Sequence, residues 1–104
     1  MNNQEKNSYV RSRILKALLE MMRVDNFDSI TISRLTAKAE VGRASFYRNY
    51  QTKEDVLRQE AERLNNELND IRRNDDPNDY RLKLLRTLDF YKANSDFYMT
   101  VYNA

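Results

Sequence analysis

The sequence predicts an all-α protein: a three-helix bundle containing a helix-turn-helix, followed by a long connecting helix and one or two further helices. Three observations lead to this prediction. The 104 residues include one Gly and one Pro, which is typical of helices joined by short loops. Apolar residues recur at three- and four-residue spacing, as on the buried face of a helix. Short polar groups containing Thr, Asn or Asp separate these segments.

The first helix is predicted over about residues 8–24, after a polar stretch at residues 1–7 that we expect to be a frayed arm. Its apolar stripe consists of Ile14, Leu15, Leu18, Leu19, Met21 and Met22. The pattern breaks at residues 25–28, where Phe27 is predicted to anchor the loop in the core.

Two short helices joined by a tight turn are predicted next. Thr31 suits the N-cap of the first, because its hydroxyl can accept a hydrogen bond from a free amide. Ile32, Leu35 and Ala39 of that helix are predicted to face the core. The turn occupies residues 40–42, and the second short helix covers about residues 43–49.

A long helix is predicted from residue 53 to about residue 73. Thr52 and Asp55 resemble a capping box, with a hydroxyl at the cap and a carboxylate three positions later. A seam at four- and three-residue spacing should pack against other helices: Leu57, Ala61, Leu64, Leu68 and Ile71.

Residues 74–79 should stop that helix and start another. Asp76 is predicted to cap the new helix, Pro77 to take its first position and Asp79 to lie in its first turn. The helix should end near residue 93, with these residues inward: Leu84, Leu85, Leu88 and Tyr91.

A sixth helix is expected after a break at residues 94–96. It is dense in apolar and aromatic residues, namely Phe97, Tyr98, Met99, Val101 and Tyr102. Such a segment needs a packing partner: it docks on the two preceding helices, it meets another chain, or the sequence has lost elements that once covered it.

The composition excludes several kinds of site. Without Cys the chain has no disulfide and no thiolate metal site, and without His it lacks the commonest metal ligand and general base. We therefore expect no enzyme, no metal and no cofactor. No apolar run approaches the roughly 20 residues of a membrane span, and the N-terminus is polar, so we expect a soluble, cytoplasmic protein.

The charge is unevenly distributed along the chain. Residues 1–53 hold ten Lys or Arg against five Asp or Glu, a net charge of +5. Residues 54–104 hold eight against eleven, a net charge of −3. A basic half favours contact with a polyanion, although a solvated surface would also explain it.

The segment of residues 31–53 has the residue types that a DNA-reading helix-turn-helix needs. Ala44 and Ser45 are small enough to approach the bases closely, and Arg43 can present a bidentate fork to guanine. DNA phosphates accept hydrogen bonds, so they can be bound by a Tyr hydroxyl, by other side-chain donors and by the free backbone amides at the start of a helix. The predicted DNA-binding residues are Thr31, Ser33, Arg43, Ala44, Ser45, Tyr47, Arg48, Asn49 and Lys53. For Lys6, Arg11 and Arg13 we weigh two alternatives equally: a contact with DNA, or a solvent-exposed position without a binding role.

At these positions the chain resembles the TetR family of bacterial transcription repressors. The residues that carry the resemblance are Thr31, Ala39-Glu40-Val41, Ala44-Ser45, Tyr47, Tyr50 and Lys53-Glu54. The resemblance implies a DNA-binding domain at residues 1–52, then a connecting helix and part of a regulatory and dimerisation domain at residues 53–104. It also implies double-stranded DNA as a partner, a possible homodimer, and a small-molecule effector only if a longer C-terminal domain exists.

Three residues depart from the family pattern. Glu40 replaces the usual turn glycine, so the turn either avoids a left-handed conformation or Glu40 adopts one at some cost. Gly42 stands where a Ser often caps the recognition helix, and Arg34 where an acidic residue would complete a cap with Thr31.

The favoured function is therefore a sequence-specific DNA-binding transcriptional repressor. The alternative is a helical protein-interaction module that uses the long seam and the C-terminal aromatic residues. Clustered carboxylates at Asp75, Asp76 and Asp79 look like helix caps and do not indicate catalysis.

Overall fold

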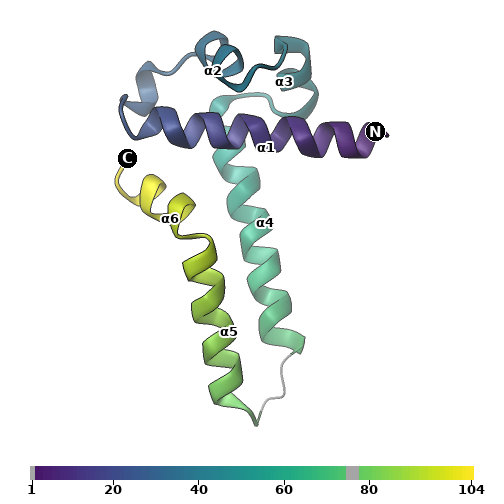
Figure 1. Ribbon diagram of the computed structural model, residues 1–104, viewed down its shortest axis with the longest axis vertical. Helices are drawn as coiled ribbons and strands as arrows, with labels where there is room; N and C mark the ends of the chain where they lie inside the picture. Colours follow the sequence, from purple (N-terminus) through teal and green to yellow (C-terminus); the bar gives the residue numbers. More distant parts are fainter. Residues whose placement is uncertain (1, 75–77) are drawn as a thin grey trace. The chain divides into compact units, whose positions relative to one another are not determined.

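The computed structural model describes residues 2–74 and 78–104, which contain helices and no strand. The helices are α1 (Asn3–Met22), α2 (Ile32–Ala39), α3 (Arg43–Asn49), α4 (Lys53–Asn74), α5 (Tyr80–Ala93) and α6 (Ser95–Tyr102), with a short 3-10 helix at Phe27–Ser29 (Figure 1). The all-α prediction is confirmed. The described chain forms two compact units, one reaching to Arg58 and the other spanning Gln59–Asn103.

The first helix begins earlier than predicted. The Asn2 side chain accepts a hydrogen bond from the Glu5 amide at 2.8 Å, and the Glu5 carboxylate accepts one from the Asn2 amide at 3.4 Å. This capping box satisfies free amides at the helix start. The prediction of a frayed arm is therefore wrong, although Asn with Glu three positions later is itself a capping signal in the sequence.

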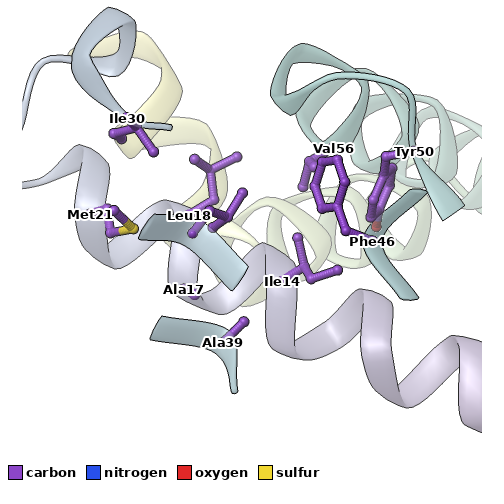
Figure 2. Packing of buried hydrophobic residues seen from close by; sticks show 10 residues of the cluster. Ile14, Ala17, Leu18, Met21, Ile30, Ala39, Phe46, Tyr50 and Val56 are labelled. Atoms are coloured by element: carbon purple, nitrogen blue, oxygen red, sulfur yellow. The ribbon is translucent and has the colours of Figure 1, made fainter. Parts of the chain in front are cut away.

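The first unit is built on one apolar cluster. Both α2 and α3 lie on the same side of α1 (Figure 1). The buried members of the cluster are Ile14, Ala17, Leu18, Met21, Ile30, Leu35, Ala39, Phe46, Tyr50 and Val56. Figure 2 shows Phe46, Tyr50 and Val56 gathered at one end of it, above Ile14. The predicted inward faces of α1 and α2 are confirmed, and Phe27 packs against the cluster while half-buried.

The seam predicted on α4 is confirmed only in part. Val56, which we did not expect inside, is buried, while its neighbour Leu57 is half-buried. Leu64 and Leu68 are buried, but Ala61 is exposed. The reason is that the start of α4 contributes to the first unit and the remainder to the second, so one continuous seam does not serve both.

The start of α5 also differs from the prediction. The Asp79 carboxylate accepts a hydrogen bond from the Leu82 amide at 3.0 Å, so Asp79 is the N-cap and not a first-turn residue. The helix therefore begins at Tyr80. Asp76 and Pro77, the predicted cap and first position, lie outside the described residues.

The predicted inward face of α5 is wrong. Leu84, Leu85, Leu88 and Tyr91 are 41–58% exposed, whereas Phe90 is 5% exposed. The least exposed line of the helix continues from Phe90 through half-buried Lys83 and Thr87, at three- and four-residue spacing. An apolar stripe states which residues favour burial, but neighbouring helices decide which face is covered. Here they cover the Phe90 face.

Aromatic residues join α5 and α6 in the second unit. The ring centroids of Tyr91 and Tyr98 lie 5.4 Å apart, and those of Phe97 and Tyr98 lie 5.7 Å apart. Burial, followed by Tyr91 and the carboxylates of Glu60 and Glu67, raises the pKa of Tyr98. Phe97 and Tyr98 thus pack within the chain, which agrees with the first of the three alternatives, packing against the preceding helices.

None of the helices in residues 2–74 and 78–104 combines the length and the apolar character needed to cross a bilayer.

Candidate nucleic-acid interface

The helix α3 is anchored by aromatic residues on one side and open on the other. Phe46 is fully buried and Tyr50 is 6% exposed, and their ring centroids lie 5.5 Å apart. Arg43, Ala44 and Arg48 are exposed, and Tyr47 is 50% exposed. Four of the predicted DNA-binding residues therefore point away from the core, along one short helix.

The turn before α3 closes α2 with a Schellman motif. The Val41 amide donates to the Thr36 carbonyl at 3.1 Å, and the Glu40 amide donates to the Ala37 carbonyl at 3.2 Å. Glu40 has φ 58° and ψ 43°, the left-handed conformation, so the second of the two alternatives for this residue is the observed one. Gly42 has φ −75° and serves as the N-cap of α3 without a side-chain hydrogen bond.

An arginine from α1 reaches this turn. Arg13 donates from Nε to the Ala39 carbonyl at 2.7 Å and from Nη2 to the Glu40 carboxylate at 3.0 Å. Its Nη1 donates to the Tyr9 hydroxyl at 2.8 Å, and the guanidinium lies 5.4 Å from the Tyr9 ring centroid. Arg13 is therefore engaged within the protein.

Comparison with known proteins agrees with this geometry. Residues 14–59 match the family model of bacterial regulatory proteins, tetR family. The chain carries a tetR-family N-terminal domain. Members of this family bind DNA through a helix-turn-helix and regulate transcription. No curated protein and no solved structure matches the chain.

The start of this tetR-family domain's α2 agrees with the prediction. The Thr31 hydroxyl accepts a hydrogen bond from the Arg34 amide at 3.1 Å, which confirms Thr31 as the N-cap. Thr31 and Ser33 are both exposed. Arg34 binds the Asp25 carboxylate at 2.8 Å, so it ties α2 to the preceding loop instead of completing a capping box.

Lys53 is held by the domain itself. Its ammonium donates to the carbonyls of Phe27 at 2.6 Å and Ile30 at 2.9 Å, and it lies 4.5 Å from the Phe27 ring centroid. Two of its three N–H groups are thus used, which leaves one for a phosphate. No pattern in the sequence signals these contacts, because residues 27–30 and Lys53 meet only in the fold.

Asn49 connects α3 to α1. Its Nδ2 donates to the Ser45 carbonyl at 2.8 Å, and its Oδ1 accepts from Nη1 of Arg11 at 3.2 Å. Both side chains are half-buried. The structure therefore shows Asn49 and Arg11 supporting the orientation of α3.

The junction between α3 and α4 is closed by the predicted capping box. The Thr52 hydroxyl accepts from the Asp55 amide at 3.2 Å, and the Asp55 carboxylate accepts from the amides of Thr52 at 3.3 Å and Gln51 at 2.9 Å. The Gln51 amide, followed by Arg58, lowers the pKa of Asp55. The box is confirmed, and it fixes how the chain leaves α3.

Proposed function

We propose that this protein is a sequence-specific transcriptional repressor that reads the major groove of an operator with α3. The observation that carries the proposal is the exposure of Arg43, Ala44, Tyr47 and Arg48 on a helix anchored by buried Phe46. A recognition helix needs this combination, because its backbone has to approach the base edges while its far side is fixed. Membership of the tetR family supports the same function.

Each exposed residue has a role that fits its chemistry. Arg43 reads a guanine through its two-pronged guanidinium, and Ala44 with Ser45 permits close approach to the bases. Tyr47 and Arg48 donate to phosphates. We assign phosphate contacts also to Thr31 and Ser33 at the start of α2, where the helix dipole favours an anion.

Lys53 and Asn49 have combined roles in this proposal. Each supports the fold through the hydrogen bonds described above. Lys53 has one further N–H for a phosphate, and its positive charge adds to the net charge of +5 on residues 1–53. We propose that residues 1–52 act as the DNA-binding domain, and that residues 53–104 form the connecting helix and part of a regulatory and dimerisation domain.

The proposal extends to partners. A repressor of this kind pairs as a homodimer on a palindromic operator, with half-sites about one helical turn or a small multiple apart. It acts in the cytoplasm, where bacterial DNA is found. A small-molecule effector enters only with a longer C-terminal domain.

A second candidate function is a helical protein-interaction module. The outward leucines of α5, which are 50–58% exposed at Leu84, Leu85 and Leu88, favour it. DNA binding by the protein distinguishes the two functions.

Mobility shift on duplex DNA tests the repressor function. The wild-type protein first selects duplexes from a random library, and its affinity for the selected duplex is compared with that for a scrambled one. We expect Arg43→Ala to lower the preference for the selected duplex by about 1–3 kcal/mol, because base readout is lost. Tyr47→Phe should lower the affinity for both duplexes equally, because a phosphate contact carries no sequence information.

Lys92→Ala on α5 is the matched control, because it removes one positive charge from an exposed position in the second unit, whereas α3 belongs to the first. It should leave the preference unchanged. Equal loss of affinity on both duplexes for Arg43→Ala would remove Arg43 from base readout. Binding with a steep salt dependence and no duplex preference would reduce the function to general polyanion binding.

A further inference from the structure

We propose that Arg13 is a positioning residue for DNA recognition, because it holds the turn before α3 in the left-handed conformation that Glu40 adopts. This inference rests on the proposed DNA-binding function. It concerns a residue of α1 that lies outside the helix-turn-helix and, on this view, contacts no DNA.

The backbone at Glu40 is the first part of the argument. Within residues 2–74 and 78–104, Glu40 is the non-glycine residue with positive φ, at 58°. An L-residue is disfavoured there because Cβ crowds the following carbonyl oxygen, so a Schellman motif usually has glycine at this position. Something outside the turn has to offset this preference.

The contacts of Arg13 supply that offset. Two carbonyls at the end of α2, those of Thr36 and Ala37, are satisfied by the turn's own amides. The Ala39 carbonyl is bound by Nε of Arg13 at 2.7 Å, while Nη2 holds the Glu40 carboxylate at 3.0 Å. One planar guanidinium therefore donates hydrogen bonds both to the main chain just before Glu40 and to the side chain of Glu40. A flexible lysine ammonium does not offer this fixed fork.

The placement of Arg13 is itself restrained. The Tyr9 hydroxyl accepts from Nη1 at 2.8 Å, one helical turn earlier on α1. The Arg13 side chain is 33% exposed, compared with 78% for Glu40, so its stem is largely covered. α1 thus presents a preorganised group to the turn.

The orientation of α3 depends on this turn. Gly42 gives α3 no side-chain cap, so the path of the chain into the helix is set by residues 40–41 and by the burial of Phe46. If the turn populates other conformations, Arg43 meets the base edges only in a fraction of molecules. The apparent affinity for the preferred duplex then falls by that fraction.

A double-mutant cycle tests the inference. Arg13→Ala is made in the wild-type chain and in Glu40→Gly, and affinity is measured on the duplex selected by the wild-type protein and on its scrambled counterpart. We expect Arg13→Ala to weaken selected binding about tenfold with Glu40 present, and by less than about twofold with Gly at that position. Glycine needs no clamp, because it enters the left-handed region freely.

Salt dependence separates positioning from direct contact. Because Arg13 is proposed to touch no phosphate, Arg13→Ala should leave the slope of log affinity against log salt unchanged. A lost phosphate contact would lower that slope by about one. Lys16→Ala, which removes one charge from an exposed position of α1, is the matched control and should show the same small effect with Glu40 or Gly at the turn.

Each outcome bears on one of the two claims. An equal loss for Arg13→Ala in both turn backgrounds overturns the role of Arg13 while the DNA-binding function stands. A wild-type protein that prefers no duplex overturns the proposed function itself, and the role of Arg13 with it. Should Arg13→Ala fail to fold by circular dichroism, Arg13→Lys keeps the charge and the covered stem, and the same cycle is run with it.

Discussion

The two units of this chain bury their apolar residues to different degrees. In the first unit, Ile14, Leu18, Leu35 and Phe46 are completely buried. In the second, nine large apolar residues are 37–83% exposed: Tyr80, Leu82, Leu84, Leu85, Leu88, Tyr91, Met99, Val101 and Tyr102. Three exposed residues of this kind belong to the first unit: Tyr9, Val24 and Tyr47.

This difference shows what each unit requires from its surroundings. In the first unit the apolar faces of α1, α2 and α3 meet one another and the start of α4, so the unit presents mainly polar groups outward and is suited to contact DNA. In the second unit the neighbouring helices leave the leucine face of α5 partly exposed. An exposed apolar surface of this kind marks a place where other groups can bind.

The largest expected effect is in the first core. Phe46→Ala should lower the free energy of unfolding by about 3–5 kcal/mol, because it leaves a cavity among fully buried residues. Leu88→Ala, at a site that is 54% exposed, should change it by no more than about 0.5 kcal/mol. Urea unfolding followed by circular dichroism measures both.

If Phe46→Ala does not fold, Phe46→Leu serves in its place, with an expected loss of about 1 kcal/mol. A loss for Leu88→Ala as large as that for the core variant would break the comparison, because it would mean that the α5 leucines are covered in solution.

An intermediate effect is expected at Lys53. Lys53→Met removes the donor to the carbonyls of Phe27 and Ile30. The Phe27 carbonyl still accepts from the Ile30 amide at 3.1 Å, but the Ile30 carbonyl loses the Lys53 donor, and an unpaired buried acceptor costs about 1–3 kcal/mol of unfolding free energy. Lys92→Met on α5 is the control and should have little effect, since Lys92 is exposed. Thermal and urea unfolding in the absence of DNA give the result. An unchanged stability would show that these two hydrogen bonds do not stabilise the fold.

The smallest effect concerns acid stability at the junction of α3 and α4. The pKa of Asp55 is lowered, first by the Gln51 amide and then by Arg58, so its contribution is present above the ordinary Asp pKa of about 3.9 and is lost as the pH falls through the lowered value. Asp55→Asn should therefore flatten the loss of stability below about pH 4.

Urea unfolding repeated between neutral and acid pH measures this dependence, with Asp89→Asn on α5 as the matched control. If the unfolding free energy falls as steeply at acid pH in Asp55→Asn as in the wild-type protein, other carboxylates are responsible for the acid dependence.

Much of the candidate site was predictable, because its signals are local. The bounds of α3 follow from the turn at residues 40–42 and the aromatic positions after it. The caps at Thr31 and Thr52 follow from hydroxyl groups placed before helical patterns. The bonds of Arg13 to the turn, of Lys53 to the loop at Phe27 and of Asn49 to α1 were not predictable, because each joins residues far apart in the chain.

The second unit shows the same limit in its core. The spacing of Leu84, Leu88 and Tyr91 predicted an inward face, yet Phe90 occupies that position. Periodicity identifies an apolar face, but burial depends on which neighbours that face meets.

The amino-acid sequence by itself determined the helical class, the order of the helices, the caps at Thr31 and Thr52 and the polar face of α3, because hydrogen bonds and side-chain spacing within a few residues decide these features. The tertiary structure alone decided which face of α5 is covered, the left-handed turn at Glu40 and the partners of Arg13 and Lys53. These features depend on contacts between segments that are far apart in the chain and meet only in the folded protein. In such contacts, the conformation that is stable for one residue depends on the residues packed against it.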